Sequence, residues 1–117
     1  MTTPVGPYTP LVRAGDWLVA SGQVGIRDGK LVAGGVEEQL RQAVANLRAL
    51  LESAGSGLEQ VVKTTVFLRH MSDYARMNEV YIDVFGDHRP ARSAIGVAEL
   101  PLNALVEVEA WAWTGAD

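Results

Sequence analysis

The segment 105–113 constrains the fold most, because its residues alternate with the two-residue period of a β-strand and neither of its faces suits water. One face is small and apolar, whereas the other combines carboxylates with tryptophans: the first consists of Val106, Val108, Ala110 and Ala112, and the second of Leu105, Glu107, Glu109, Trp111 and Trp113. Such a strand needs cover on both sides of its sheet. We therefore expect helices of the same chain on one side and another subunit on the other.

The rest of the chain alternates between strand and helix patterns and contains no internal repeat. Periodicity and composition predict strands over residues 16–20, 31–32, 61–69, 93–98 and 105–113, and helices over residues 36–54 and 73–86. The strand at 61–69 is apolar on both alternating faces, which predicts a central strand that is buried on two sides. Together these elements predict an α+β fold in a single domain over residues 1–117.

Local signals predict where the elements begin and end. Asp28-Gly29 is typical of a tight hairpin turn, and Gly55 is expected to end the first helix. Ser72 is the predicted N-cap of the second helix. The segment 100–103 predicts a turn that joins the last two strands as a hairpin.

Composition argues against several classes of function. The chain has no cysteine, which excludes disulfides, thiolate nucleophiles and cysteine-based zinc sites. His70 and His88 lie in separate predicted loops, so we expect no metal site. A net charge of −4 without a basic stripe disfavours nucleic acid as a partner. No apolar run is long enough to span a membrane and no secretion signal is visible, so the expected location is the cytoplasm.

Two charged residues on neighbouring predicted strands indicate chemistry on a small carboxylic acid. Arg92 offers a planar fork of donors that matches a carboxylate, and a partly dehydrated Glu107 can take a proton from water. The plainer alternative is an interface ion pair between Arg92 and Glu107 or Glu109. A hairpin at 100–103 would also place Arg92 closer to Trp111 than to Glu107, with an offset on the order of 13 Å along the strand. A different register or a contact across subunits would remove this gap.

Short motifs follow one another along nearly the whole chain. In order, they are Gly6-Pro7-Tyr8, Ser21-Gly22-Gln23, residues 42–47, Val62-Lys63-Thr64-Thr65-Val66-Phe67-Leu68, Met77-Asn78-Glu79-Val80-Tyr81, Pro90-Ala91-Arg92-Ser93, Leu100-Pro101 and Val106-Glu107-Val108-Glu109-Ala110. With these motifs the sequence resembles the reactive intermediate deaminases of the Rid/YjgF family. The resemblance implies a chorismate-mutase-like fold with a mixed β-sheet and two helices on one face. It also implies a homotrimer with ligand pockets at the subunit interfaces and no cofactor.

The resemblance further implies an activity and a set of site residues. Relatives with this arginine typically hydrolyse 2-imino acids, such as 2-iminobutanoate and 2-iminopropanoate, to 2-oxo acids and ammonia. Arg92 would bind the substrate carboxylate, and Glu107 would position or deprotonate the attacking water. Further pocket positions of the family correspond to Tyr8, Ser21, Asn78 and Ala94. Many relatives have cysteine where this chain has Ala94, so chemistry that needs a sulfur atom is not available here.

Other functions stay open at this stage. The main alternative is a protein that binds a 2-oxo acid or another small carboxylate without catalysis, for which Arg92 would also be needed. Glu107 and Glu109 are roughly 7 Å apart on one strand face, a spacing that is also compatible with glycoside hydrolysis. The broad family also includes chaperone-like and ribonuclease activities, although the acidic balance of the chain argues against RNA as the main substrate.

Overall fold

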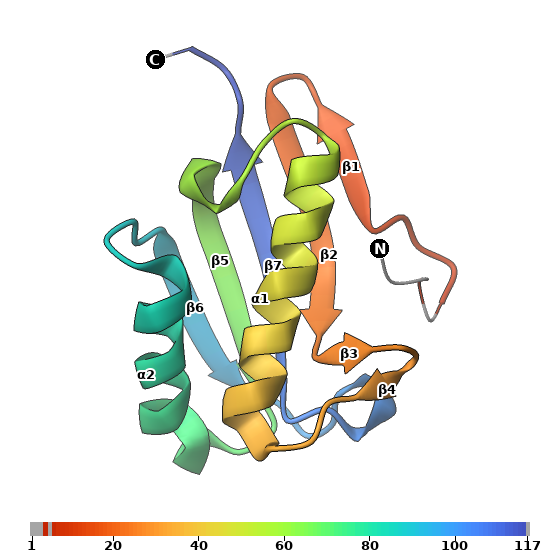
Figure 1. The fold of residues 1–117 in the computed structure, drawn as a ribbon, viewed down its shortest axis with the longest axis vertical. Helices are drawn as coiled ribbons and strands as arrows, with labels where there is room; N and C mark the ends of the chain where they lie inside the picture. The colour runs from red at the N-terminus through yellow and green to blue at the C-terminus, as the bar shows by residue number, and fades with distance from the viewer. Residues whose placement is uncertain (1–3, 5, 117) are drawn as a thin grey trace.

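A five-stranded sheet with two helices on one of its faces forms the body of the molecule (Figure 1). The computed structural model describes residue 4 and residues 6–116. The sheet has the order β1-β2-β7-β5-β6. Its strands are β1 (Leu11–Ala14), β2 (Trp17–Val24), β7 (Val106–Trp113), β5 (Val61–Leu68) and β6 (Ala91–Gly96), and the helices are α1 (Gly35–Ser53) and α2 (Tyr74–Phe85). The predicted α+β class, with both helices on one face, is confirmed.

The sheet is mixed, because β5 and β6 run parallel while the other neighbouring strands are antiparallel. The expected hairpin between the last two strands is wrong: β7 pairs with β2 and β5, and β5 separates it from β6. The reason lies in α2, which carries the chain back across the sheet after β5 and lets β6 pair in parallel. The central strand is therefore β7 and not β5, which lies one place from the edge.

Helix α1 forms as its apolar stripe predicts. Its buried face includes Leu40, Leu47 and Leu51, none of which is measurably exposed, and it packs on β2 and β7. The helix ends at Ser53, and Gly55 follows with a φ of 79°, the left-handed conformation that glycine adopts without strain. These residues, with the inner faces of β5 and β7, build the main hydrophobic core.

The first part of the sheet is longer than predicted. β1 has no counterpart among the predicted strands, and the strand predicted at 16–20 extends as β2 to Val24. β2 contains an irregularity between Ala20 and Gln23, where its register against β7 shifts. The predicted Asp28-Gly29 turn is confirmed between the short strands β3 (Ile26–Arg27) and β4 (Lys30–Leu31), with positive φ at both turn residues.

Helix α2 begins later than predicted. A short 3-10 helix (Met71–Asp73) precedes it, and its N-cap is Asp73, so the predicted cap at Ser72 is wrong. Asp73 makes no side-chain capping bond to the helix and lies instead 3.7 Å from the guanidinium of Arg76. Helix propensity and burial on the sheet therefore set this helix start more than a capping side chain does.

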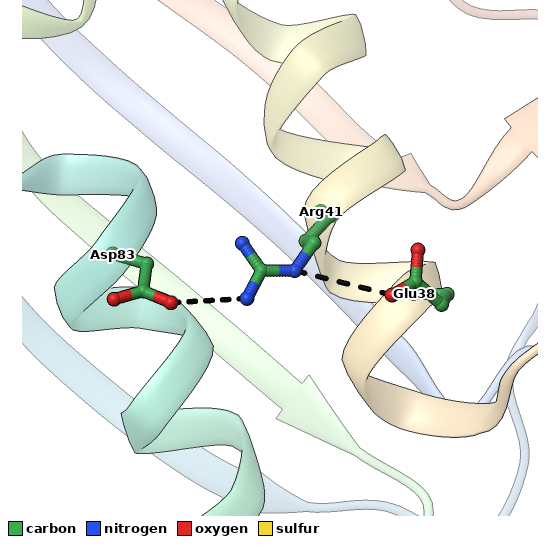
Figure 2. A network of polar contacts seen from close by, with 3 residues as sticks. All are labelled: Glu38, Arg41 and Asp83. Carbon is green, nitrogen blue, oxygen red and sulfur yellow. Dashed lines mark hydrogen bonds and ion pairs between the residues drawn. The ribbon is translucent and has the colours of Figure 1, made fainter.

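An exposed ion-pair network joins the two helices (Figure 2). Arg41 of α1 donates from Nη2 to Asp83 Oδ2 of α2 at 3.0 Å, and its Nε lies 4.0 Å from Glu38 Oε1. All three side chains are substantially exposed to solvent, so the network contributes little stability, in the range of about 0–1 kcal/mol.

The face of the sheet opposite the helices is only partly covered by the described chain. Trp17 packs edge-to-face against Trp111 and Trp113, with ring centroids 5.9 and 5.0 Å apart. Trp111 is still 44% exposed, and Val62 of β5 is 45% exposed. The expectation that the 61–69 strand is buried on two sides is thus wrong for the single chain, because helices cover one face only.

Candidate functional site

A pocket of about 340 Å³ lies where the outer face of the sheet meets the N-terminal segment and the loop before β7. Three of the residues predicted from the sequence line it, namely Tyr8, Ser21 and Glu107. The full lining consists of Pro4, Tyr8, Pro10, Ser21, Gly22, Gln23, Val24, Ile26, Asn46, Pro101, Glu107 and Glu109. The lining therefore combines polar groups with apolar side chains, as in sites for small organic molecules.

The carboxyl group of Glu107 packs directly against Gly22 of β2. A Cβ atom on Gly22 would lie 2.7 Å from Glu107 Cδ and 2.8 Å from its Oε2, which is closer than such atoms approach. Gly22 falls within the irregular part of β2, between Ala20 and Gln23. The missing side chain and the local shift in register together make room for the carboxyl group beside the backbone.

Burial raises the pKa of Glu107 above its ordinary value, and the neighbouring negative charge of Glu109 raises the pKa further. Both carboxylates are half-buried on the same strand face. A carboxylate with a raised pKa holds a proton more readily than an exposed one, which suits it to taking a proton from water and returning it.

The other polar groups of the pocket are tied to the backbone around it. Ser21 donates from Oγ to the carbonyl oxygen of Thr9 at 2.7 Å, which leaves the hydroxyl oxygen able to accept. Gln23 Nε2 donates to the carbonyl oxygen of Ser21 at 3.2 Å. Asn46 of α1 donates from Nδ2 to the carbonyl oxygens of Val24 and Ile26, so it ties the backbone at the end of β2 to the helix.

Arg92 lies at a second place, between β6 and α2. Its Nη1 donates to Asn78 Oδ1 at 2.8 Å, and its Nη2 donates to the hydroxyl of Tyr74 at 3.1 Å. The guanidinium carbon is 4.9 Å from the centroid of the Tyr81 ring, within the range of a cation–π contact. Of the predicted site residues, Asn78 is therefore beside Arg92 and not beside Glu107.

Within one chain, Arg92 and Glu107 lie on opposite faces of the sheet. Arg92 pairs with Thr64 of β5, which is buried on the helix side of the sheet. Glu107 pairs with Phe67 of β5 and projects to the other side. β5 runs between their strands. In the described residues, no ion pair joins Arg92 to Glu107 or Glu109. The ion pair of Arg92 with Glu107 or Glu109 therefore does not form within the chain. A site that contains both Arg92 and Glu107 does not form within it either.

The remaining predicted positions lie away from the pocket. Ala94 is half-buried on β6 and packs against the main core. His88 makes a 2.7 Å hydrogen bond with the carbonyl oxygen of Val61. Across residues 4 and 6–116, no group of three His, Asp or Glu side chains could hold a metal ion, and no helix is both long and apolar enough to cross a membrane.

Several residues of the candidate site are not predicted from the sequence. Gly22 and Gln23 follow Ser21 in one of the motifs, but only the strand irregularity shows that they border the pocket. Tyr74 and Tyr81 read as members of the apolar stripe of α2, and only the parallel placement of β6 brings Arg92 against them. The spacing of four and three residues between Tyr74, Asn78 and Tyr81 does place them on one helix face.

Known proteins resemble this chain over almost its whole length. A family model described as Endoribonuclease L-PSP matches residues 1–114. A RutC family protein of Pyrococcus horikoshii is 45% identical over 112 residues, which cover 94% of this chain and 89% of the relative. A Mus musculus protein named 2-iminobutanoate/2-iminopropanoate deaminase is 44% identical over 113 residues, which cover 95% of this chain and 84% of the relative.

Solved structures agree with the sequence relatives. The crystal structure of the YjgF gene product of E. coli matches with a TM-score of 0.90 at 37% identity, covering 96% of this chain and 91% of that one. Such identities over nearly complete chains show common descent as well as a common fold. The chain belongs to the Rid/YjgF family.

Proposed function

We propose that this protein hydrolyses 2-imino acids, such as 2-iminobutanoate and 2-iminopropanoate, to 2-oxo acids and ammonia. The observation that carries the proposal is the half-buried Glu107 carboxylate, with a raised pKa, in a pocket that also holds the Ser21 hydroxyl. The mouse relative named as such a deaminase supports it at 44% identity. A guanidinium suited to a carboxylate is present in Arg92.

The proposed reaction uses these groups without a covalent intermediate. Glu107 takes a proton from water while the oxygen adds to the carbon of the C=N bond, which gives a tetrahedral carbinolamine. Glu107 passes this proton to the nitrogen, which completes the carbinolamine. The remaining hydroxyl proton is then transferred through Glu107 to the same nitrogen as the C=O bond forms, and the C–N bond breaks with loss of ammonia. Arg92 holds the substrate carboxylate throughout, and Ser21 or Tyr8 can hydrogen-bond the developing oxygen.

The proposal includes assembly as a homotrimer with pockets between subunits. Arg92 and Glu107 face opposite sides of one sheet, so a site that contains both must take them from different chains. The exposed Trp111 and Val62 supply an apolar face that a neighbouring chain can cover. In each pocket, Arg92 from one chain would thus meet Glu107, Tyr8 and Ser21 from the next. The cytoplasm stays the predicted location.

The proposal is tested by generating 2-iminobutanoate in solution with an amino-acid oxidase and trapping the surviving imine with semicarbazide. The wild-type protein should lower the amount of trapped imine, whereas Arg92→Ala and Glu107→Gln should not. Glu52→Gln, which changes an exposed carboxylate on α1, is the matched control and should act as wild type. Unchanged trapping with the wild-type protein, across imines of several amino acids, would contradict the deaminase.

The same variants separate the enzyme from a protein that only binds carboxylates. Glu107→Gln should abolish hydrolysis but still bind 2-oxobutanoate, because Arg92 is intact. Equal loss of binding and hydrolysis would favour the binding protein. The ribonuclease activity in the family description is not proposed, because a net charge of −4 opposes binding to a phosphate backbone.

A further inference from the structure

Helix α2 presents four side chains to the guanidinium of Arg92, namely Tyr74, Met77, Asn78 and Tyr81, and two of them are aromatic. Tyr74, Asn78 and Tyr81 recur at steps of four and three residues, which places them on one face of the helix. Arg92 Nη1 and Nη2 donate to Asn78 Oδ1 and to the Tyr74 hydroxyl. The guanidinium carbon lies 4.9 Å from the Tyr81 ring centroid and 5.6 Å from that of Tyr74.

These contacts hold a side chain that would otherwise move freely. β6 is the edge strand of the sheet, so the sheet itself supports Arg92 on one side only. Arginine has many rotamers, and the entropy of ordering them reduces the affinity for any ligand that it binds. The helix face supplies this order before the ligand arrives, by the hydrogen bonds to Asn78, Tyr74 and Met77 Sδ and by the cation–π contact with the Tyr81 ring.

The ring of Tyr81 is itself fixed in place. Its hydroxyl lies 2.7 Å from Thr64 Oγ1 in the core, and both residues are buried. Burial raises the pKa of Tyr81, so the phenol stays neutral and its ring keeps the electron-rich face that attracts a cation. Thr64 is also the residue of β5 that pairs with Arg92, so one buried hydrogen bond links the strand pair to the helix.

We infer that Tyr74 and Tyr81 are positioning residues that orient the Arg92 guanidinium for a substrate carboxylate. The inference rests on the proposed function for its substrate, and it adds two residues to the predicted site. Asn78 acts in the same way, because its amide oxygen is engaged by Arg92. A change in this helix face then alters how tightly the carboxylate is bound, more than how fast the C=N bond is hydrolysed.

The test uses variants that separate the ring from the hydroxyl. Tyr74→Phe removes the acceptor for Arg92 Nη2 and keeps the ring, Tyr81→Phe removes the bond to Thr64 and keeps the ring, and Tyr81→Leu removes the ring. Asp83→Asn is the matched control, because it removes the charge from a polar contact of the same helix that is made with Arg41 and not with Arg92 (Figure 2). Thermal unfolding of each variant checks its fold.

Two ligands report on the guanidinium specifically. Calorimetry measures the Kd of 2-oxobutanoate and of 2-oxobutanamide, which has the same skeleton without the negative charge. Tyr74→Phe is expected to weaken 2-oxobutanoate binding by about threefold to tenfold and to leave the amide unchanged. Tyr81→Leu should weaken it by about tenfold or more, Tyr81→Phe should restore most of that loss, and Asp83→Asn should match wild type. The KM for 2-iminobutanoate should rise in parallel while kcat stays within about twofold of wild type.

The outcomes that would overturn the inference are distinct from those that overturn the deaminase. Equal weakening of both ligands, or an unchanged Kd of 2-oxobutanoate in Tyr74→Phe and Tyr81→Leu, shows that the helix face does not orient Arg92. A wild-type protein that binds no 2-oxobutanoate also overturns it. If Tyr81→Leu does not fold, Tyr74→Phe decides alone, because Tyr74 is 40% exposed. Binding without imine hydrolysis contradicts the deaminase only, and the ligand comparison still decides the role of the helix face.

Discussion

At the scale of single residues, the properties of Glu107 follow from what surrounds it. Gly22 leaves the space that its carboxyl group occupies, and Glu109 adds a like charge two positions along the same strand face. The sequence identifies Glu107 as a candidate through its place between apolar residues of a strand. The sequence does not show that this carboxyl group packs against Gly22, because that contact depends on an irregularity in the neighbouring strand.

The like charge of Glu109 leads to a prediction about pH. As a base, Glu107 acts in its ionised form, so hydrolysis should increase as the pH rises through its raised pKa. Glu109→Gln removes one cause of the shift and is expected to move this acid limb to lower pH. The limb should stay above the ordinary glutamate range, about 4.3, because burial is the larger cause. The pH profile of kcat/KM measures it, and an unmoved limb would assign the titration to another group.

At the scale of elements, periodicity predicts helices and strands well but does not predict their neighbours. The stripe in residues 36–54 and the alternation in 105–113 depend on local spacing alone, and both elements form close to the predicted bounds. Strand order depends on contacts that are distant in sequence. The last two strands, β6 and β7, are expected to form a hairpin because they are successive in the chain. Instead, β7 lies between β2 and β5, because both of its faces suit a position inside the strand order and not at an edge.

The sequence does not predict β1, because its local pattern is weak. Its residues, Leu11–Ala14, are mostly exposed and show little alternation, so only the Gly15-Asp16 turn before Trp17 signals a strand pair. The sequence also gives no sign of the irregularity in β2, because Ser21-Gly22-Gln23 resembles a loop. Local patterns therefore define the helix-covered core, whereas the pocket is built where strands depart from regular pairing.

The irregular part of β2 gives a prediction that does not depend on any activity. Gly22→Ala places a Cβ on the Glu107 carboxyl group, which must move aside, and is expected to destabilise the protein by up to about 1 kcal/mol, because the carboxyl group is the end of a flexible side chain. In a Glu107→Ala background the same change should cost far less, because the overlapping atoms are gone. Urea unfolding of the four proteins at one protein concentration measures the difference. Equal costs in both backgrounds would show that the carboxyl group does not rest there.

At the scale of the whole molecule, the separation of Arg92 from Glu107 is the main result that sequence reasoning did not supply. The sequence places both residues on strands but cannot show on which side of a shared sheet each one projects. Here the two sides are fixed by pairing with Thr64 and Phe67 of β5. One chain therefore holds the two parts of the proposed site apart, on opposite faces of its sheet.

A mixing experiment tests whether these two parts, taken from different chains, form the pocket. Arg92→Ala and Glu107→Gln chains are each expected to be inactive alone. When equal amounts are unfolded and refolded together, one pocket in four should combine a native Arg92 with a native Glu107, so about a quarter of wild-type hydrolysis should return. The semicarbazide assay measures it, with each variant refolded alone as the control. No recovery from the mixture, despite a wild-type size distribution, would argue against sites shared between chains.

All three tryptophans of the sequence, Trp17, Trp111 and Trp113, gather on the sheet face that the helices leave open. Their indole rings are thus natural optical probes of that face. Neither helix contains a tryptophan. Ultraviolet emission from this protein will accordingly respond to association between chains.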